Sequence, residues 1–250
     1  MVFRMSLAKV KAFFVCLWVC LLVTYPVISK AEQNPITIAC AANFSATMEK
    51  LVARFQARQQ TPVALRVATG SSSGLATQIM YGAPYDLFFS ADEQLVQRLV
   101  QDGIGYEHTR YAIGELVLYS RENMAAGLEA ALLNITEATL AIANPKLAPY
   151  GAAAEAVLLK RGVQPRKLVR GTSVLHAFQF VESGHAQFGL IAKSLLQSTH
   201  QGHWLTIPSH WHPPIEQHAL LLSQKATASA FFDFVQSEEG QSLIKASGYR

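Results

Sequence analysis

The 250-residue sequence contains three cysteines, and 15% of its residues are charged. Two of the cysteines, Cys16 and Cys20, lie in an N-terminal segment that we expect to be removed. That leaves Cys40 without a partner, which excludes a fold held together by intramolecular disulfides. We interpret Cys40, in a strand-like run, as a small buried hydrophobe. After the N-terminal segment there is no further apolar run long enough to predict a membrane span.

The N-terminal segment has the three parts of a secretory signal peptide. Three basic residues precede an uncharged apolar run at positions 12–23, and Ser29 and Ala31 provide a small-residue cleavage site. We therefore predict that residues 1–31 are a signal peptide, that the mature chain begins near Glu32, and that it is periplasmic. An uncleaved N-terminal anchor is the alternative interpretation.

An excess of one sign of charge is also missing once the signal peptide is set aside. The whole chain has 21 basic and 17 acidic residues. Four of the basic residues lie in residues 1–31, so the mature chain keeps 17, equal to its number of acids. This balance leaves no excess of basic residues that would bind nucleic acid, and we expect no nucleic-acid partner.

Strand-like and helix-like segments alternate along the mature chain, which predicts an α/β fold with mainly parallel sheets flanked by helices. The expected strands are 36–41, 63–68, 85–91, 113–119, 139–143, 167–170, 188–192 and 219–222, and the expected helices are 44–59, 75–81, 92–101, 152–161, 174–182, 226–236 and 240–245. The chain crosses twice between two groups of elements, near 112–120 and 215–222. This predicts two lobes, one of residues 32–114 with 217–250 and the other of residues 115–216.

Four strand-to-helix turns present backbone N–H groups that have no partner within their helix. These turns are Ala42-Asn43, Gly70 to Ser73, Pro149-Tyr150-Gly151 and Thr172-Ser173-Val174. Ligands of α/β sheets bind beyond the carboxyl ends of the strands, and helix N-termini favour anions. None of the four turns contains Lys or Arg. The pattern indicates an anion site of uncharged donors between the lobes, although four ordinary capped helix starts would give the same pattern.

The serine-rich turn supports a second function class as well. Gly70-Ser71-Ser72-Ser73-Gly74 matches the G-x-S-x-G motif of a nucleophile elbow, and it lies between a strand and a helix. A serine hydrolase with Ser72 as the nucleophile is therefore the alternative. The turn follows only the second strand, however, and no His-Gly-Gly loop precedes it to supply an oxyanion hole.

Four histidines, His203, His210, His212 and His218, gather near the end of the sequence. The His210-x-His212 pair would place two imidazoles on one face of a strand, which is one way to bind a metal. Three prolines nearby instead mark the segment as a surface crossover. We interpret the four histidines as solvated side chains and predict no metal cation.

Short polar side chains precede two of the expected helices and are typical N-caps. Asn43 would cap the helix after the first strand, and Asp92 would cap the helix that begins after the third strand. Asp86 and the pair Asp92-Glu93 flank one strand end and have the composition of paired catalytic carboxylates. We favour the capping role for Asp92.

Several longer stretches resemble the periplasmic molybdate-binding proteins of ABC transporters, and the resemblance spans essentially the whole mature chain. The most specific stretch is Gly82-Ala83-Pro84-Tyr85-Asp86-Leu87-Phe88-Phe89-Ser90-Ala91-Asp92, and the others are 38–43, 70–79, 111–120, 143–151 and 213–215. The resemblance implies a two-lobed periplasmic-binding-protein fold. It also implies a monomer that closes on a molybdate or tungstate oxyanion and delivers it to a membrane permease, with no enzymatic activity and no cofactor.

The resemblance also implies the ligand-binding residues. Asn43 and a serine of the serine-rich turn, Ser72, would bind the oxyanion from the first lobe, and the backbone N–H groups of Tyr150 and Val174 would bind it from the second. Some relatives add a tyrosine hydroxyl after a later strand. Ala192 stands at that position here, so the resemblance implies a site without that hydroxyl.

Overall fold

The computed structural model describes residues 35–124, 127–198 and 201–250, which form two five-stranded sheets. The predicted signal peptide lies outside these residues. Within the described part of the chain, no helix has the length and apolar character needed to cross a membrane.

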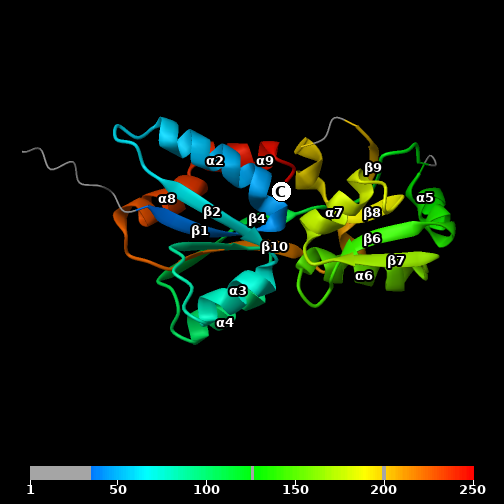
Figure 1. Ribbon diagram of the computed structural model, residues 1–250, viewed down its shortest axis with the longest axis horizontal. Coiled ribbons are helices and arrows are strands. Elements are labelled where there is room, and N and C mark those ends of the chain that lie inside the picture. The colour runs from blue at the N-terminus through cyan, green and yellow to red at the C-terminus, as the bar shows by residue number, and fades with distance from the viewer. Residues whose placement is uncertain (1–34, 125–126, 199–200) are drawn as a thin grey trace, which may run out of the picture. The chain divides into compact units, whose positions relative to one another are not determined.

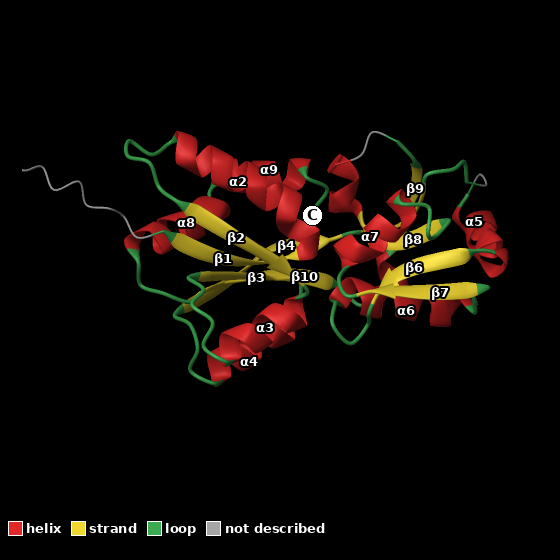
Figure 2. Cartoon of the chain, in the orientation of Figure 1, coloured by secondary structure: helices red, strands yellow, loops and turns green. Residues whose placement is uncertain are grey.

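The first sheet carries helices on both faces (Figures 1 and 2). Its strands, in spatial order, are β2 (Leu65–Gly70), β1 (Ile36–Ala41), β3 (Leu87–Ser90), β10 (Ile215–Leu221) and β4 (Glu107–Gly114). Its helices are η1 (Ala42–Phe44), α2 (Ser45–Ala57), α3 (Ser72–Met80), α4 (Glu93–Gln101), α8 (Ala226–Gln236) and α9 (Glu238–Ala246). Two apolar clusters fill the two faces. One contains Phe44, Met48 and Phe231, and the other contains Leu75, Val96 and Leu220.

The second sheet is built almost entirely from the middle of the chain. Its strands, in spatial order, are β7 (Lys167–Gly171), β6 (Thr139–Ala143), β8 (Phe188–Ala192), β5 (Leu116–Ser120) and β9 (His203–Thr206). Its helices are α5 (Leu128–Asn134), η2 (Ile135–Glu137), α6 (Pro149–Arg161), α7 (Val174–Glu182), η3 (Lys193–Ser198) and η4 (Ser209–Trp211). Helices α6 and α7 pack on the central strands β6 and β8, so both helices begin at the carboxyl ends of parallel strands.

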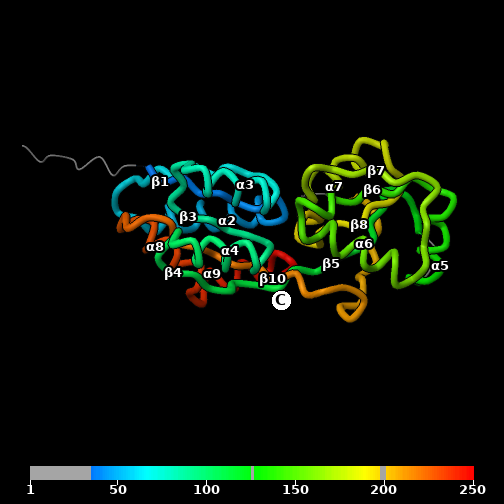
Figure 3. Tube along the Cα trace, turned by 90° about the horizontal axis from the view of Figure 1, so that it is seen from below, coloured from blue at the N-terminus to red at the C-terminus, as the bar shows by residue number. Residues whose placement is uncertain are grey.

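Each sheet is mixed. In the first, β1 pairs in parallel with β2 and β3, while β10 pairs antiparallel with β3 and β4. In the second, β6 pairs in parallel with β7 and β8, while β5 pairs antiparallel with β8 and β9. The antiparallel pairings involve the strands next to the two crossings of the chain (Figure 3). Strands β5 and β10 each enter their sheet directly from the other sheet, without the crossover helix that a parallel connection needs. Each therefore runs antiparallel to its neighbours.

The first crossing differs from the single strand expected over 113–119. The structure has two strands there, β4 and β5, which belong to different sheets and are separated by Glu115. Strand β4 also begins at Glu107, earlier than the sequence pattern indicated, because its outer residues are exposed and polar and give no apolar run. Helix α5 and strand β9 were not expected from the sequence at all.

The remaining differences are shifts at the ends of elements. Strand β10 begins at Ile215 rather than at 219, β2 spans Leu65–Gly70 rather than 63–68, and some helices begin earlier than expected. Helices α3 and α6 begin at Ser72 and Pro149, so residues expected in turns form the first helical turn. The prediction that Asn43 is an N-cap is wrong, since it lies inside η1 and makes no capping bond. The Asp92 cap is confirmed, because its side chain accepts a hydrogen bond from Gln94 N. The burial of Cys40 in β1 is confirmed as well.

Candidate functional site

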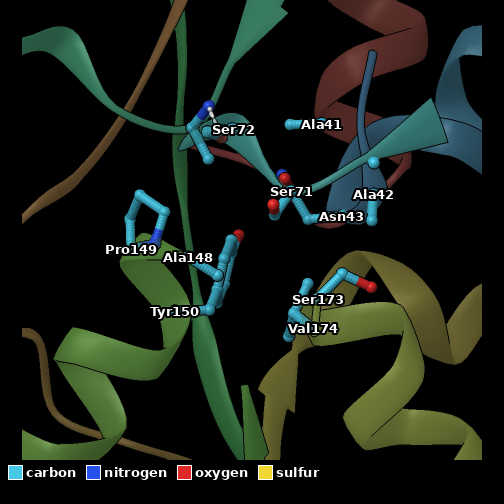
Figure 4. Close-up of a pocket in the computed structure, with 12 residues that line it drawn as sticks. Ala41, Ala42, Asn43, Ser71, Ser72, Ala148, Pro149, Tyr150, Ser173 and Val174 are labelled. Carbon is cyan, nitrogen blue, oxygen red and sulfur yellow. Dashed lines mark hydrogen bonds between the residues drawn. The ribbon is translucent and has the colours of Figure 1, made fainter. Parts of the chain in front are cut away.

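The four turns singled out in the sequence meet at one pocket (Figure 4). The space between its lining atoms, including the opening to solvent, is about 200 Å³. The lining residues are Ala41, Ala42, Asn43, Gly70, Ser71, Ser72, Ala91, Ala148, Pro149, Tyr150, Ser173 and Val174. None of these residues is charged, and none is a histidine. Asn43, Ser72, Tyr150 and Val174, the four residues that the resemblance implied, are all among them.

Two serines of the first lobe place hydroxyl groups at the pocket. Ser71 is the N-cap of α3, and its Oγ accepts a hydrogen bond from Gly74 N at 3.2 Å. Ser72 is 2% exposed, and its Oγ accepts a hydrogen bond from Ala91 N at 3.0 Å. A hydroxyl that accepts one bond still has its own O–H to donate. Both serines can therefore donate to an anion while their oxygens are fixed by the backbone.

Asn43 contributes to the pocket in a different way. Its Nδ2 donates to Gln217 Oε1 at 2.7 Å and to Tyr249 Oη at 3.0 Å. An amide nitrogen has two hydrogens, so both are used by these bonds. The backbone N–H of Asn43, in the first turn of η1, has no partner within that helix. The structure thus makes the main chain of Asn43, rather than its side chain, the group available to a ligand.

A buried polar cluster holds Asn43 in this position. The Asn43 carbonyl oxygen accepts from Ser194 Oγ at 2.7 Å and lies 2.8 Å from Tyr249 Oη. Gln217 Nε2 donates to the Ile215 carbonyl oxygen at 3.0 Å. These residues come from η3, from β10 and from the segment after α9, all far from Asn43 in the sequence. The start of η1 is therefore positioned by contacts from both lobes.

The second lobe offers main-chain donors at two helix starts. Pro149 occupies the first position of α6 and has no N–H, so Tyr150 carries the first N–H of that helix. Val174 is the first residue of α7, and Ser173 caps that helix by accepting from His176 N at 3.2 Å. First-turn N–H groups have no partner in their own helix and carry the positive end of the helix dipole. Both groups are therefore suited to an anion.

The Tyr150 side chain takes no part in this donation. It packs against Gly114, where the chain first crosses between the two sheets. It is 1% exposed, and its hydroxyl has no hydrogen-bond partner among the described residues. A Cβ at Gly114 would lie 2.1 Å from Tyr150 Oη, so only glycine leaves room for this ring. Burial raises the pKa of Tyr150 well above its usual value. The phenol therefore remains neutral.

The geometry gives the hydrolase alternative no support. Ser72 Oγ is bonded to a backbone N–H, and the pocket lining supplies no imidazole or carboxylate to act as a general base. His176, in the first turn of α7, accepts instead from Thr172 N at 3.3 Å through Nδ1. The sequence motif G-x-S-x-G is here a helix start with its cap.

The interpretation of the later histidines as solvated is right for part of the group and wrong for one member. His203 and His210 are exposed and His212 is partly buried, whereas His218 is 6% exposed. His218 lies on β10, two residues after Glu216, so both side chains point to the face of the sheet that α4 covers. The prolines that indicated a surface crossover end at residue 214, before this strand begins.

Comparisons with known proteins agree with this architecture. Residues 36–250 match the family described as "Bacterial extracellular solute-binding protein". The chain is 35% identical over 228 residues to "Molybdate-binding protein ModA" of Rhodobacter capsulatus, covering 88% of this chain and 89% of that protein. It superposes on the Azotobacter vinelandii periplasmic molybdate-binding protein with a TM-score of 0.80 and 30% identity, covering 86% of this chain and 98% of that one.

A more distant structure shares the fold alone. The sulfate-binding protein SubI from Mycobacterium tuberculosis superposes with a TM-score of 0.65 at 17% identity, covering 86% of both chains. The two-lobed fold is therefore common to proteins named for different oxyanions. The family match, by contrast, covers nearly all of the described residues. On this evidence the chain is a member of the bacterial extracellular solute-binding protein family.

Proposed function

We propose that this protein captures molybdate or tungstate outside the cytoplasm and delivers it to the membrane permease of an ABC transporter. The observation that carries the proposal is the convergence of four helix-start segments on one pocket without a charged residue. The names of the relatives at 35% and 30% identity point to the same ligand class.

A pocket of neutral donors suits a tetrahedral dianion. Hydrogen bonds from neutral donors to a charged oxygen are short and stronger than bonds between neutral groups. Backbone N–H groups at helix starts also carry partial positive charge, so no lysine or arginine is needed. Because no ion pair has to be broken, the ligand is released when the lobes open.

We assign the oxyanion donors as follows. The Ser72 hydroxyl and the main-chain N–H of Asn43 bind from the first lobe, and the N–H groups of Tyr150 and Val174 bind from the second. Ser71 is an additional donor that the sequence did not single out, although its place directly before a helix is the usual signal of a cap. The lobe boundaries that fit this assignment lie at residues 114–115 and 216–217.

Selectivity follows from the donors and from the size of the pocket. A site made only of donors disfavours a protonated oxyanion, because its O–H would find no acceptor. Phosphate, which is partly protonated at neutral pH, should therefore bind worst. The pocket is fixed by backbone, so a smaller ion such as sulfate would leave some donors at longer distances and weaker bonds.

Isothermal titration calorimetry of the purified mature protein tests the proposal. Molybdate, tungstate, sulfate and phosphate are titrated separately at constant ionic strength, after dialysis to remove bound anions. We expect one site per chain, with molybdate or tungstate tightest. Sulfate or phosphate binding as tightly as molybdate would overturn the ligand assignment, and no binding of any oxyanion would overturn the binding-protein role.

We further propose that residues 1–31 are cleaved and that the mature protein is a periplasmic monomer. The charged start, apolar run and small-residue site support the cleavage. Intact mass of protein from the periplasmic fraction should correspond to a chain that begins near Glu32, and light scattering should give the mass of one chain. A species that retains Met1 and is found only in membranes would contradict this.

A further inference from the structure

A second cluster of polar side chains lies outside the oxyanion pocket, between α4 and β10. It consists of Glu93, Glu216 and His218. His218 Nε2 lies 4.0 Å from Glu93 Oε1 and 3.9 Å from Glu216 Oε2. One ligand atom from each of the three residues lies within 4.8 Å of the other two. The cluster thus brings one imidazole and two carboxylates together.

His218 is the unusual member of this cluster. Only 8% of its side chain is exposed, and neither ring nitrogen has a hydrogen-bond partner among the described residues. Burying a polar group without a hydrogen-bond partner is unfavourable. The two carboxylates lie too far from Nε2 to form hydrogen bonds. An ion between them and the imidazole would give Nε2 the partner it lacks.

The carboxylates are already oriented by other side chains. Arg110 Nη1 donates to Glu216 Oε1 at 2.8 Å, which leaves Oε2 facing His218. Gln97 Nε2 donates to Glu93 Oε1 at 2.9 Å, the oxygen that lies near the imidazole. Partners of this kind fix the direction of metal ligands in proteins. Arg110 forms a salt bridge with Glu216, whereas no lysine or arginine among the described residues forms one with Glu93.

The cluster is open to solvent on one side. Glu93 and Glu216 both line a hollow that also borders Pro213, Pro214 and Ala152, and whose space, including the part open to solvent, is about 780 Å³. Their side chains are 39% and 23% exposed, respectively. An ion could therefore enter from this side and keep a water ligand there, while the buried His218 provides the inner ligand.

We propose that Glu93, Glu216 and His218 form a binding site for a divalent first-row transition metal ion of the Zn²⁺ class. Nitrogen and carboxylate ligands bind Zn²⁺ at about 2.0–2.2 Å, and three protein ligands with one water is a common arrangement. Pairs of ligand atoms around such an ion are about 3–3.5 Å apart, so the two separations from His218 Nε2 must shorten by about 1 Å or less. The separation between the two carboxylate oxygens is at most 4.8 Å, and it must shorten by less than about 2 Å. The imidazole disfavours Mg²⁺ and Ca²⁺, which prefer oxygen ligands.

The proposed ion would link two elements near the oxyanion pocket without being part of it. Glu93 follows Ala91 by two residues, and the Ala91 N–H is bonded to Ser72 Oγ. Glu216 precedes Gln217, which is bonded to Asn43. The metal site does not rest on the proposed oxyanion function, since it stands on the geometry of α4 and β10.

The test is titration of the chelator-treated mature protein with Zn²⁺ by calorimetry, and with Co²⁺ followed by visible absorption. We expect one ion per chain and the absorption of a Co²⁺ ion with nitrogen and oxygen ligands. Glu93→Gln should weaken binding at least about tenfold, since even loss of an outer partner costs that much. His218→Asn should do the same, and thermal unfolding would establish that it remains folded.

Matched controls separate this site from adventitious binding. Glu238 lies in the first turn of α9 as Glu93 lies in the first turn of α4, so Glu238→Gln removes a carboxylate of the same kind elsewhere. His210→Asn removes an exposed histidine. Both controls should bind Zn²⁺ like the parent protein. Zn²⁺ binding that is absent, or that is equal in Glu93→Gln and Glu238→Gln, would overturn the proposal.

Discussion

The two halves of the oxyanion pocket present their donors in different ways. The first lobe uses hydroxyl side chains, Ser71 and Ser72, together with a main-chain segment held by a buried polar cluster around Asn43. The second lobe uses main-chain N–H groups at the starts of α6 and α7. The first half therefore depends on the identity of its side chains, whereas the second half depends on where its backbone lies.

Among changes in the two halves, Ser72→Ala should cause the largest loss of oxyanion affinity. This change removes a donor to the oxyanion and leaves the Ala91 N–H without its acceptor. We expect a loss of about 1.5–3 kcal/mol in oxyanion binding, or about tenfold to a hundredfold in affinity. Calorimetric titration with molybdate measures it. An affinity equal to that of the parent protein would remove Ser72 from the site.

A second prediction concerns the cluster that supports the first half, and it compares two buried tyrosines. Tyr249 and Tyr111 both pack against Phe44, with ring centroids 5.4 and 4.7 Å away. The Tyr249 hydroxyl bonds to Asn43 and Ser194, whereas the Tyr111 hydroxyl has no partner among the described residues. Tyr249→Phe should lower the free energy of unfolding by about 1–3 kcal/mol.

Tyr111→Phe is the matched control for that change. It removes a hydroxyl that makes no hydrogen bond, so the free energy of unfolding should stay the same or rise. Urea denaturation of the two variants and the parent gives both values. Equal destabilisation by the two changes would show that the polar cluster contributes nothing beyond ring packing.

The second half should tolerate a change of side chain. In Val174→Ala the proposed donor, a backbone N–H, remains in place at the start of α7. We expect the molybdate affinity to change by less than about 0.5 kcal/mol, as for changes away from a functional contact. Thermal unfolding would report the separate cost of removing two buried methyl groups. An affinity loss as large as that of Ser72→Ala would refute the distinction between the halves.

Salt should produce the smallest effect, and it tests both halves together. The pocket lining has no charged side chain, and buried dipole contacts are screened little by added ions. The molybdate affinity should fall only weakly between low and moderate concentrations of sodium chloride. A steep dependence in the calorimetric titrations would indicate a basic residue acting on the ligand from outside the pocket lining.

The sequence predicted those features that local pattern controls. The limits of β1, β6, β8, α7 and α8 agree with the expected segments, since each is an apolar run or a helical repeat with a clear end. The four turns were also found. Gly, Ser or Pro marks three of these helix starts in the sequence itself, and in the fourth Ala42-Asn43 follows directly after the first strand. The family resemblance then selected Asn43, Ser72, Tyr150 and Val174 from them.

Contacts between distant parts of the chain could not be predicted. Asn43 was taken for a helix cap, but its side chain bonds to residues 174 and 206 positions away. His218 was taken for a solvated residue, because nothing in the sequence shows that α4 covers β10. Similarly, the break of one expected strand at Glu115 becomes visible only when the two sheets are known. These features depend on tertiary pairing, which single-sequence periodicity does not report.

The buried cysteine has a practical consequence for following the lobes in solution. Cys40 is the single cysteine among the described residues, and its side chain is fully buried. Burial also raises the pKa of its thiol, so little reactive thiolate forms. In the mature protein, from which Cys16 and Cys20 are removed with the proposed signal peptide, a cysteine introduced at the exposed Ala152 of α6 would thus be the thiol that a maleimide dye modifies. The folded protein can carry one fluorophore beside its pocket without prior removal of its own cysteine, which makes it a ready scaffold for an optical oxyanion sensor.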